Sequence, residues 1–231
     1  MKTLVSSHAL FGAIGAAALL FAGAPLAAAA TVTTASSDTA FAVSNVDLLQ
    51  TDLLGVVTTG AFGVSGSASE PVLRDGANPN VFVDYGSTSL VVDGSTATYT
   101  LDTVTNVLGY TITSIATYAQ WNDGRDRQDI VIEYDTVGNP GTYINIASYS
   151  FDPDPTFSRV VTTPSGLDTF LATGVQSLRF TFPNQENGYG GYRELDVFGV
   201  AVAVPEPATY ALMLAGLTGV VLARKRRRSV R

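Results

Sequence analysis

The sequence predicts an all-β fold, built as an antiparallel β-sandwich. Short runs of alternating apolar and polar residues recur along the chain, and they are rich in β-branched and aromatic side chains. Clusters of Gly, Asn, Asp and Pro separate these runs, and no amphipathic helix pattern lies between them. Because alternation with a period of two buries one face of a strand and leaves the other in water, this pattern is typical of sandwiches and barrels.

The strand signals are clearest in the second half of the chain. In the run "DIVIEYD", for example, Ile130, Ile132 and Tyr134 share one face of the expected strand. Residues 31–70 are rich in Thr, Ser, Ala and Gly, so one or two opening strands and a partly mobile lead-in are both compatible with them. Strands are expected at residues 97–102, 110–119, 129–135, 142–151, 175–182 and 192–202.

The chain begins with a segment typical of a signal peptide. A weakly basic Met-Lys start is followed by an apolar stretch and then by four alanines at 27–30, the small residues that signal peptidase prefers. We expect cleavage just before Thr31, and an uncleaved membrane helix is the alternative. The expected organisation is a signal peptide at 1–30, an extracytoplasmic β-sandwich domain at 31–203 and a separate C-terminal segment at 204–231.

The composition of residues 31–203 excludes several functions. Six arginines stand against 19 acidic residues, a net charge of about −13, which argues against binding nucleic acid. The region has no Cys and no His, so it has no disulfide, no Ser-His-Asp triad, no cysteine nucleophile and no usual zinc site. Carboxylate chemistry remains, but most Asp residues stand in turn contexts. We therefore expect no enzyme and no catalytic residues; a secreted carboxylate-dependent glycan-acting enzyme is the alternative.

Three segments of the domain resemble one known fold family. They are "VLRDGANPNVFVDYG", "LGYTITSIATYAQWNDGRDRQDIVIEYDT" and "VQSLRFTFPNQENGYGGYRELDVFG", which together span residues 72–199. In order and spacing they are similar to the early Asp-Gly loop, the central hairpin and the closing strands of the galactose-binding-like, discoidin-type jelly roll. That group includes many carbohydrate-binding modules.

The resemblance implies a structural Ca²⁺ ion. Asp75 and Glu194 match the positions whose side chains hold it in the family, with backbone carbonyls near Asn78 completing the shell. Such ligands would join the two ends of the domain, and calcium prefers six to eight oxygens. This chain departs from the family pattern at Asn80 and Phe82. The alternative is that Asp75 only shapes a turn and Glu194 is a solvated strand residue.

Sugar binding needs an aromatic surface with a few polar groups around it. The candidates are Trp121, which is the one tryptophan, and its neighbours Asn122 and Arg125, together with Tyr189 and Tyr192. Arg127 lies in the same loop, and arginine offers a rigid fork for sugar hydroxyls or carboxylates. In the alternative, Trp121 closes the core and the arginines pair with the aspartates at 123, 126 and 129.

The C-terminal segment combines three features in order. Pro205, Glu206 and Pro207 end the last strand, because proline cannot continue it. Residues 208–223 form an uncharged apolar run, which as a helix would be roughly 24 Å long and would span a bilayer only marginally. A basic stop follows, made of Arg224, Lys225, Arg226, Arg227 and Arg228.

This arrangement closely resembles the PEP-CTERM sorting signal of Gram-negative bacteria. The resemblance implies export through the inner membrane, transient single-pass anchoring with a cytoplasmic C-terminus, and cleavage near the motif by an exosortase, a membrane cysteine transpeptidase. A permanent tether and a C-terminal helix buried in the fold are the alternatives. We expect a cell-surface or extracellular-matrix protein that binds extracellular polysaccharide or has a structural role in the matrix or biofilm.

Overall fold

The computed structural model describes residues 29–204, apart from 82–83, 122–123 and 155–156, together with residue 216. The proline motif and the basic stop lie outside these residues, as do the signal peptide up to residue 28 and the apolar run apart from residue 216. Among the described residues, no helix is long and apolar enough to cross a bilayer.

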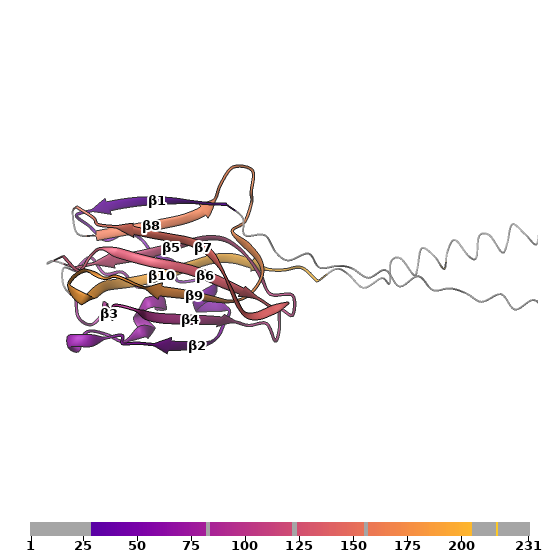
Figure 1. The fold of residues 1–231 in the computed structure, drawn as a ribbon, viewed down its shortest axis with the longest axis horizontal. Helices are drawn as coiled ribbons and strands as arrows, with labels where there is room; N and C mark the ends of the chain where they lie inside the picture. Colours follow the sequence, from indigo (N-terminus) through magenta and orange to yellow (C-terminus); the bar gives the residue numbers. More distant parts are fainter. Residues whose placement is uncertain (1–28, 82–83, 122–123, 155–156, 205–215, 217–231) are drawn as a thin grey trace, which may run out of the picture.

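Ten antiparallel strands make up the domain (Figure 1), which confirms the predicted all-β class. The short helical elements are α1 (Leu48–Thr51), η1 (Val64–Gly66), η2 (Glu70–Arg74) and η3 (Glu186–Gly188). The strands are β1 (Ala30–Ser37), β2 (Leu53–Thr59), β3 (Ser89–Val92), β4 (Ser95–Leu101), β5 (Tyr110–Gln120), β6 (Gln128–Thr136), β7 (Asn139–Phe151), β8 (Phe157–Pro164), β9 (Ala172–Phe182) and β10 (Tyr189–Ala201).

The strands form two layers that are hydrogen-bonded to each other at one corner. One layer has the order β1-β8-β5-β10-β3 and the other the order β2-β4-β9-β6-β7. The joint is short, because β5 pairs with β9 only near Tyr110 and Ile112. The alternation predicted from the sequence holds in this sandwich: Ile130, Ile132 and Tyr134 are all fully buried in the common core.

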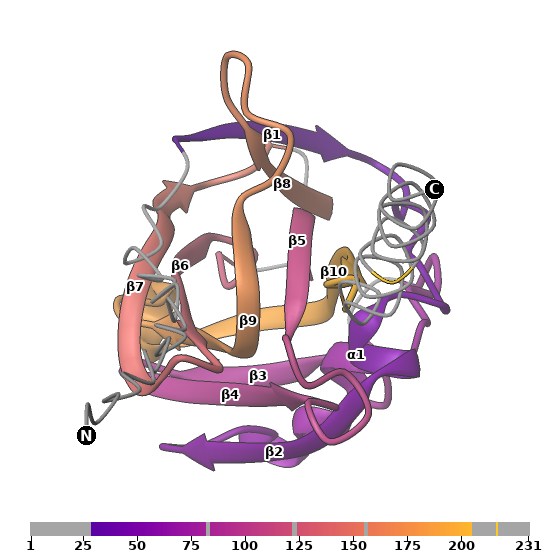
Figure 2. The same ribbon diagram turned by 90° about the vertical axis from the view of Figure 1, so that its right-hand side faces the viewer.

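The connections gather at the two ends of the strands. The tail end, where the described chain stops, carries the loops 102–109, 137–138 and 165–171 with residues 202–204, and it faces the viewer in Figure 2. Hydrogen bonds from Val202 to Gly109 and from Ser165 to Ala29 place both ends of the domain there. The opposite loop end carries the connections around Tyr85, Trp121 and Glu186.

The loop end is held to the sheet by Arg193, a buried residue of β10. One guanidinium nitrogen donates to Pro79 O at 3.3 Å and to Ser87 Oγ at 2.8 Å, and the other donates to Val81 O at 2.8 Å and to the side chain of Gln120. Desolvation lowers the pKa of Arg193 to about 10. The segment that follows Asp75 is therefore attached to β10 and β5 by one side chain.

Candidate functional site

Two carboxyl groups are buried on the outer face of β10. Glu194 and Asp196 are two residues apart and share one face of the strand, while Leu195 and Val197 face the core. Helix α1 and the turn η2 both pack against β10, and this keeps water from the two acids. Strand geometry thus places two carboxyl groups side by side in a dry environment.

Glu194 joins the beginning and the end of the domain. Its Oε1 accepts a hydrogen bond from Gln50 Nε2 at 3.1 Å, and its Oε2 accepts one from Gly76 N at 3.1 Å. The exposed residue Asp75 lies at the rim, with its carboxyl group within hydrogen-bonding reach of Glu194. The structure therefore brings together the two residues that the sequence assigned to one site, and Glu194 is not the solvated residue of the alternative hypothesis.

Asp47 and Asp196 complete this acidic cluster. Asp196 Oδ2 accepts from Ser44 N at 2.9 Å and from the Tyr118 hydroxyl at 3.1 Å. Asp47 is the N-cap of α1, and its Oδ1 accepts from the backbone N–H groups of Leu49 at 2.9 Å and Val197 at 3.2 Å. Within the described part of the chain, no ion pair neutralises Asp47, Glu194 or Asp196.

Desolvation raises the pKa values of all four acids. Desolvation, with the neighbouring charge of Asp196 next in size, raises the pKa of Glu194 to about 10. Desolvation also raises the pKa of Asp196 to about 6, and it raises the pKa values of Asp47 and Asp75. At neutral pH, without a cation, Glu194 is protonated and can donate a hydrogen bond.

Several buried oxygens around the cluster have no hydrogen-bond partner. Asp47 Oδ2 and Asp196 Oδ1 are two of them, and Oε1 of Gln50, the residue that contacts Glu194, is a third. Asn78 Oδ1 is a fourth, while Asn78 Nδ2 donates to Phe41 O at 2.9 Å. Buried acceptors without donors are uncommon in folded proteins, and they fit a hard cation that takes oxygen ligands.

The predicted ligand-binding residues at the loop end differ in their exposure. Trp121 is 2% exposed, and its indole packs edge-to-face against Tyr85 with ring centroids 5.2 Å apart. Tyr192 is fully buried, and its hydroxyl donates to Gln185 Oε1 at 2.9 Å. These two residues therefore belong to the core, which corrects the prediction that they contact a ligand and agrees with the alternative for Trp121.

Other groups of this end remain accessible. The Arg125 guanidinium lies 5.6 Å from the ring centroid of the half-buried Tyr189, and Tyr85 is 47% exposed above Trp121. Arg127 pairs with Asp129 at 3.5 Å, as the alternative expected. Asn122 lies outside the described residues.

A second acidic group lies at the loop end. Oxygens of Asp126, Asp152 and Glu186 all lie within 4.8 Å of one another. Among the described residues, no three carboxyl groups of the Glu194 cluster come this close together. Asp126 is buried, Glu186 half-buried and Asp152 exposed. A cation at Glu194 would therefore need amide and backbone oxygens as well as carboxylates, which is what the unpaired oxygens of Gln50 and Asn78 offer.

Sequence reasoning missed Asp47, Asp196 and Tyr85. For Asp196 a signal existed, because "ELD" puts two acids on one face of a strand whose other residues are apolar. No local pattern identifies the other two residues. Asp47 belongs to the acidic cluster because it bonds to Val197 of β10, and Tyr85 belongs to the loop end because its ring packs on Trp121; both partners are far away in the chain.

Comparison with known proteins identifies the tail. Residues 203–228 match the PEP-CTERM protein-sorting motif. The match includes the proline motif and the basic stop that the sequence analysis singled out. No curated protein matches the chain by sequence.

The solved structures that are similar to part of this chain include carbohydrate-binding modules. One is the CBM32 of AlyQ in complex with 4,5-unsaturated mannuronic acid, with a TM-score of 0.40 and 14% identity over 64% of this chain and 95% of that one. Another is the family 32 module of C. perfringens NanJ in complex with galactose, with a TM-score of 0.41 and 12% identity over 62% and 91%. The CBM32-1 and CBM32-2 domains of Clostridium perfringens ZmpB give a TM-score of 0.47 and 9% identity over 78% and 43%.

The buried Glu194 predicts a stability that falls as pH rises when no metal is present. In the folded state Glu194 keeps its proton up to a pH of about 10, whereas in the unfolded state it releases the proton near its ordinary pKa of 4.5. The stabilisation that protonated Glu194 gives the folded state is therefore complete below pH 4.5. It is lost as the pH rises to 10, and the free energy of unfolding falls by up to about 1.4 kcal/mol per pH unit. Urea unfolding in a chelator between pH 7.5 and 9 measures this slope, because Asp196, with a pKa of about 6, is ionised throughout this window.

The matched control is Glu194→Gln, which keeps the shape and cannot ionise. Its stability should be flat across the same window, so equal slopes in the two proteins would contradict a protonated Glu194.

Proposed function

We propose that this chain is an exported cell-surface or matrix protein, sorted through its tail, whose β-sandwich binds extracellular polysaccharide. The observation that carries the sorting part is the match of residues 203–228 to the PEP-CTERM protein-sorting motif, together with the signal-peptide pattern at the opposite terminus. Signal peptidase removes the leader, the apolar run at 208–223 holds the chain in the inner membrane, and an exosortase cleaves near Pro205–Pro207. Proline fixes φ and has no N–H, so the motif enters the protease extended.

A Ca²⁺ ion at the Glu194 cluster is the second part of the proposal. Asp75 and Glu194 supply carboxylate oxygens, and the unpaired oxygens of Asp47, Asn78 and Asp196 lie on the segments around them. The ion would replace the proton on Glu194 and offset the mutual repulsion of the acids. Its main effect is structural, because it ties the segment that starts at Asp75 to β10.

The loop end is the proposed polysaccharide site. Tyr85 presents an exposed ring supported by Trp121, and the Arg125–Tyr189 pair places a guanidinium on a second ring. The backbone N–H of Gly191 donates to Arg125 O at 2.6 Å, which connects the two groups through β10. Aromatic rings stack on the apolar faces of sugars, while arginine bonds to hydroxyls or carboxylates.

Binding is a better proposal than catalysis for this chain. Glu194 has a raised pKa, as an acid catalyst would, but it is fully buried and its carboxyl lies within hydrogen-bonding reach of Asp75. Glycosidases need two accessible carboxyls about 5 to 9.5 Å apart on either side of the scissile bond. A secreted carboxylate-dependent enzyme remains the second candidate, and hydrolysis of a polysaccharide that is lost on Asp152→Asn would establish it.

Ca²⁺ should raise the melting temperature, and it should do so more at pH 8 than at pH 6, because Glu194 must lose a proton to bind it. At a hundred times the dissociation constant the gain is about 2.7 kcal/mol. Glu194→Gln and Asp75→Asn should lose the gain, while Asp168→Asn at the tail end should keep it. A gain that survives both substitutions but disappears in Asp152→Asn would assign the ion to the second acidic group instead.

Polysaccharide binding should depend on Tyr85. In a screen of neutral and uronic-acid oligosaccharides, Tyr85→Ala and Tyr189→Ala should each weaken binding about tenfold or more, since each removes a stacking surface. Tyr143 is the matched control, because its ring lies under Arg179 at 3.7 Å on the open face of the other layer. Loss of binding in Tyr143→Ala and not in Tyr85→Ala would move the site to that face, and no binding at all would leave a structural role in the matrix.

The tail should be absent from the mature protein. Mass analysis of the secreted and cell-bound fractions should give a chain that starts at Thr31 and ends near Pro207. In cells without the sorting protease, or with Pro205 and Pro207 both changed to Ala, the tail should be retained. Recovery of a chain intact to Arg231 from cells that contain the protease would refute processing.

A further inference from the structure

The tail end carries an unusual number of exposed apolar side chains. Val104 is 76% exposed, Val107 54% and Val204 62%, and Leu167 and Val200 are also exposed. They come from two loops and from the end of β10, so segments far apart in the sequence supply one apolar rim. Large exposed aliphatic residues that gather on one face mark a surface that contacts something apolar.

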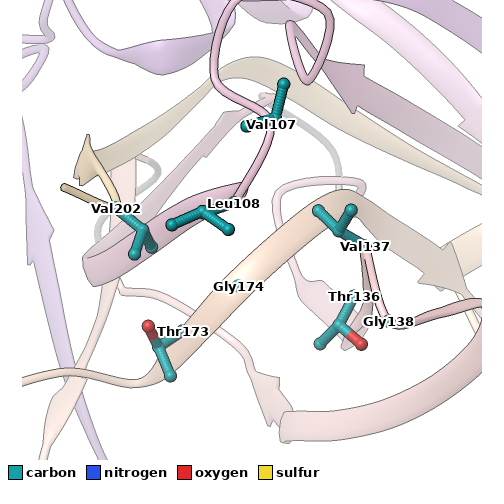
Figure 3. Close-up of a pocket in the computed structure, with 8 residues that line it drawn as sticks. All are labelled: Val107, Leu108, Thr136, Val137, Gly138, Thr173, Gly174 and Val202. Carbon is teal, nitrogen blue, oxygen red and sulfur yellow. The ribbon is translucent and has the colours of Figure 1, made fainter. Parts of the chain in front are cut away.

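A shallow apolar groove lies inside this rim (Figure 3). Its volume is about 470 Å³, and it is lined by Val107 and Leu108 on one side and by Val137 on the other, with Gly174 between them. Val202, directly before the end of the described chain, lies beside Leu108. The groove is therefore continuous with the point where the sorting signal leaves the domain.

The tail end also has few charges. Residues 102–109, 137–141, 165–174 and 202–204 contain two acidic residues, Asp102 and Asp168, and no basic residue, although the domain as a whole has a net charge of about −13. Asp52, whose backbone oxygen accepts from Asp102 N at 2.7 Å, is a third acid at this end. The remaining side chains are Val, Leu, Phe, Ala, Thr, Ser, Asn and Pro, with several glycines. Such a surface can enter the interfacial layer of a bilayer without dehydrating many charges.

The connection to the membrane anchor is too short to keep this surface away from lipid. Three residues, Pro205 to Pro207, separate Val204 from the apolar run that begins at Ala208. Fully extended, four peptide steps reach about 13 Å. The polar interface outside the hydrocarbon core is about 5 to 8 Å thick on each side, so the rim cannot be far above the headgroups.

We propose that, in the anchored precursor, the tail end docks on the outer surface of the inner membrane, with the Val104–Val107 loop and the rim of the groove in the lipid interface. This inference rests on the proposed insertion of residues 208–223. The docked domain stands with its strands away from the bilayer, so the loop end points into the periplasm. The proline motif then lies at the level of the headgroups, where a membrane-embedded protease can reach it.

The test uses the absence of cysteine from the chain, which allows single labels. The full chain is reconstituted in vesicles of phosphatidylethanolamine and phosphatidylglycerol, with an environment-sensitive fluorophore on Val107→Cys. Val81→Cys is the matched control, because it is a valine of similar exposure, 51%, at the loop end. Lipids with a nitroxide near the headgroup should quench the label at position 107 roughly threefold or more above the label at position 81.

A third label, on Leu217→Cys, separates the two ways in which the proposal can fail. Strong quenching at position 217 with none at position 107 would show that the anchor is inserted and the face does not dock, which overturns the inference alone. No quenching at position 217 would show that the tail does not insert, which overturns the anchoring as well. Protection of position 107 in the full chain without vesicles would show that the groove holds the chain's own apolar run, and this would also overturn membrane docking.

Discussion

The register shift in β10 between Tyr192 and Glu194 determines how both candidate sites are built. Tyr192 and Leu195 both face the core although they are three residues apart, which a regular strand does not allow. Arg193 is the extra residue that resets the alternation, as in a β-bulge. As a consequence, Arg193 reaches the loop end while Glu194 turns to the outer face, so two consecutive residues anchor different segments.

The two buried ionisable side chains at this bulge, Arg193 and Glu194, are stabilised in different ways. Arg193 is surrounded by oxygens from Pro79, Val81, Ser87 and Gln120, and hydrogen bonds offset its desolvation. Glu194 has two donors and three acidic neighbours, so hydrogen bonds alone do not offset its burial. A proton or a metal ion must supply the missing positive charge. With the proposed Ca²⁺ bound, the same strand position would hold the ion in place of the proton.

The sequence predicts those parts of this protein that depend on local pattern. The strands with clear alternation, such as β6 and β9, are buried on the expected faces because period-two patterning directly determines which face packs. Strand β8 was missed since it follows "FDPDPT" and ends at Pro164, residues that are typical of turns. Trp121 stands in a polar loop and resembled an exposed platform, but Tyr85, 36 positions earlier, covers its ring. Asp75 and Glu194 were paired through a family resemblance, and no periodicity in the chain could have paired them.

The division of the domain into two ends follows from strand direction. β10 carries Tyr189 at its start and leads into the sorting signal at its end, and its 13 residues separate the two by about 40 Å. Arg125 O accepts from Gly191 N near the start of that strand, Tyr85 packs on Trp121 at the same end of the domain, and the apolar rim surrounds the end of the strand. The groove proposed for membrane docking and the polar, aromatic end proposed for binding therefore lie on different surfaces. Because Tyr189 and the tail lie at opposite ends of β10, removal of the tail would expose the apolar end without touching the loop end.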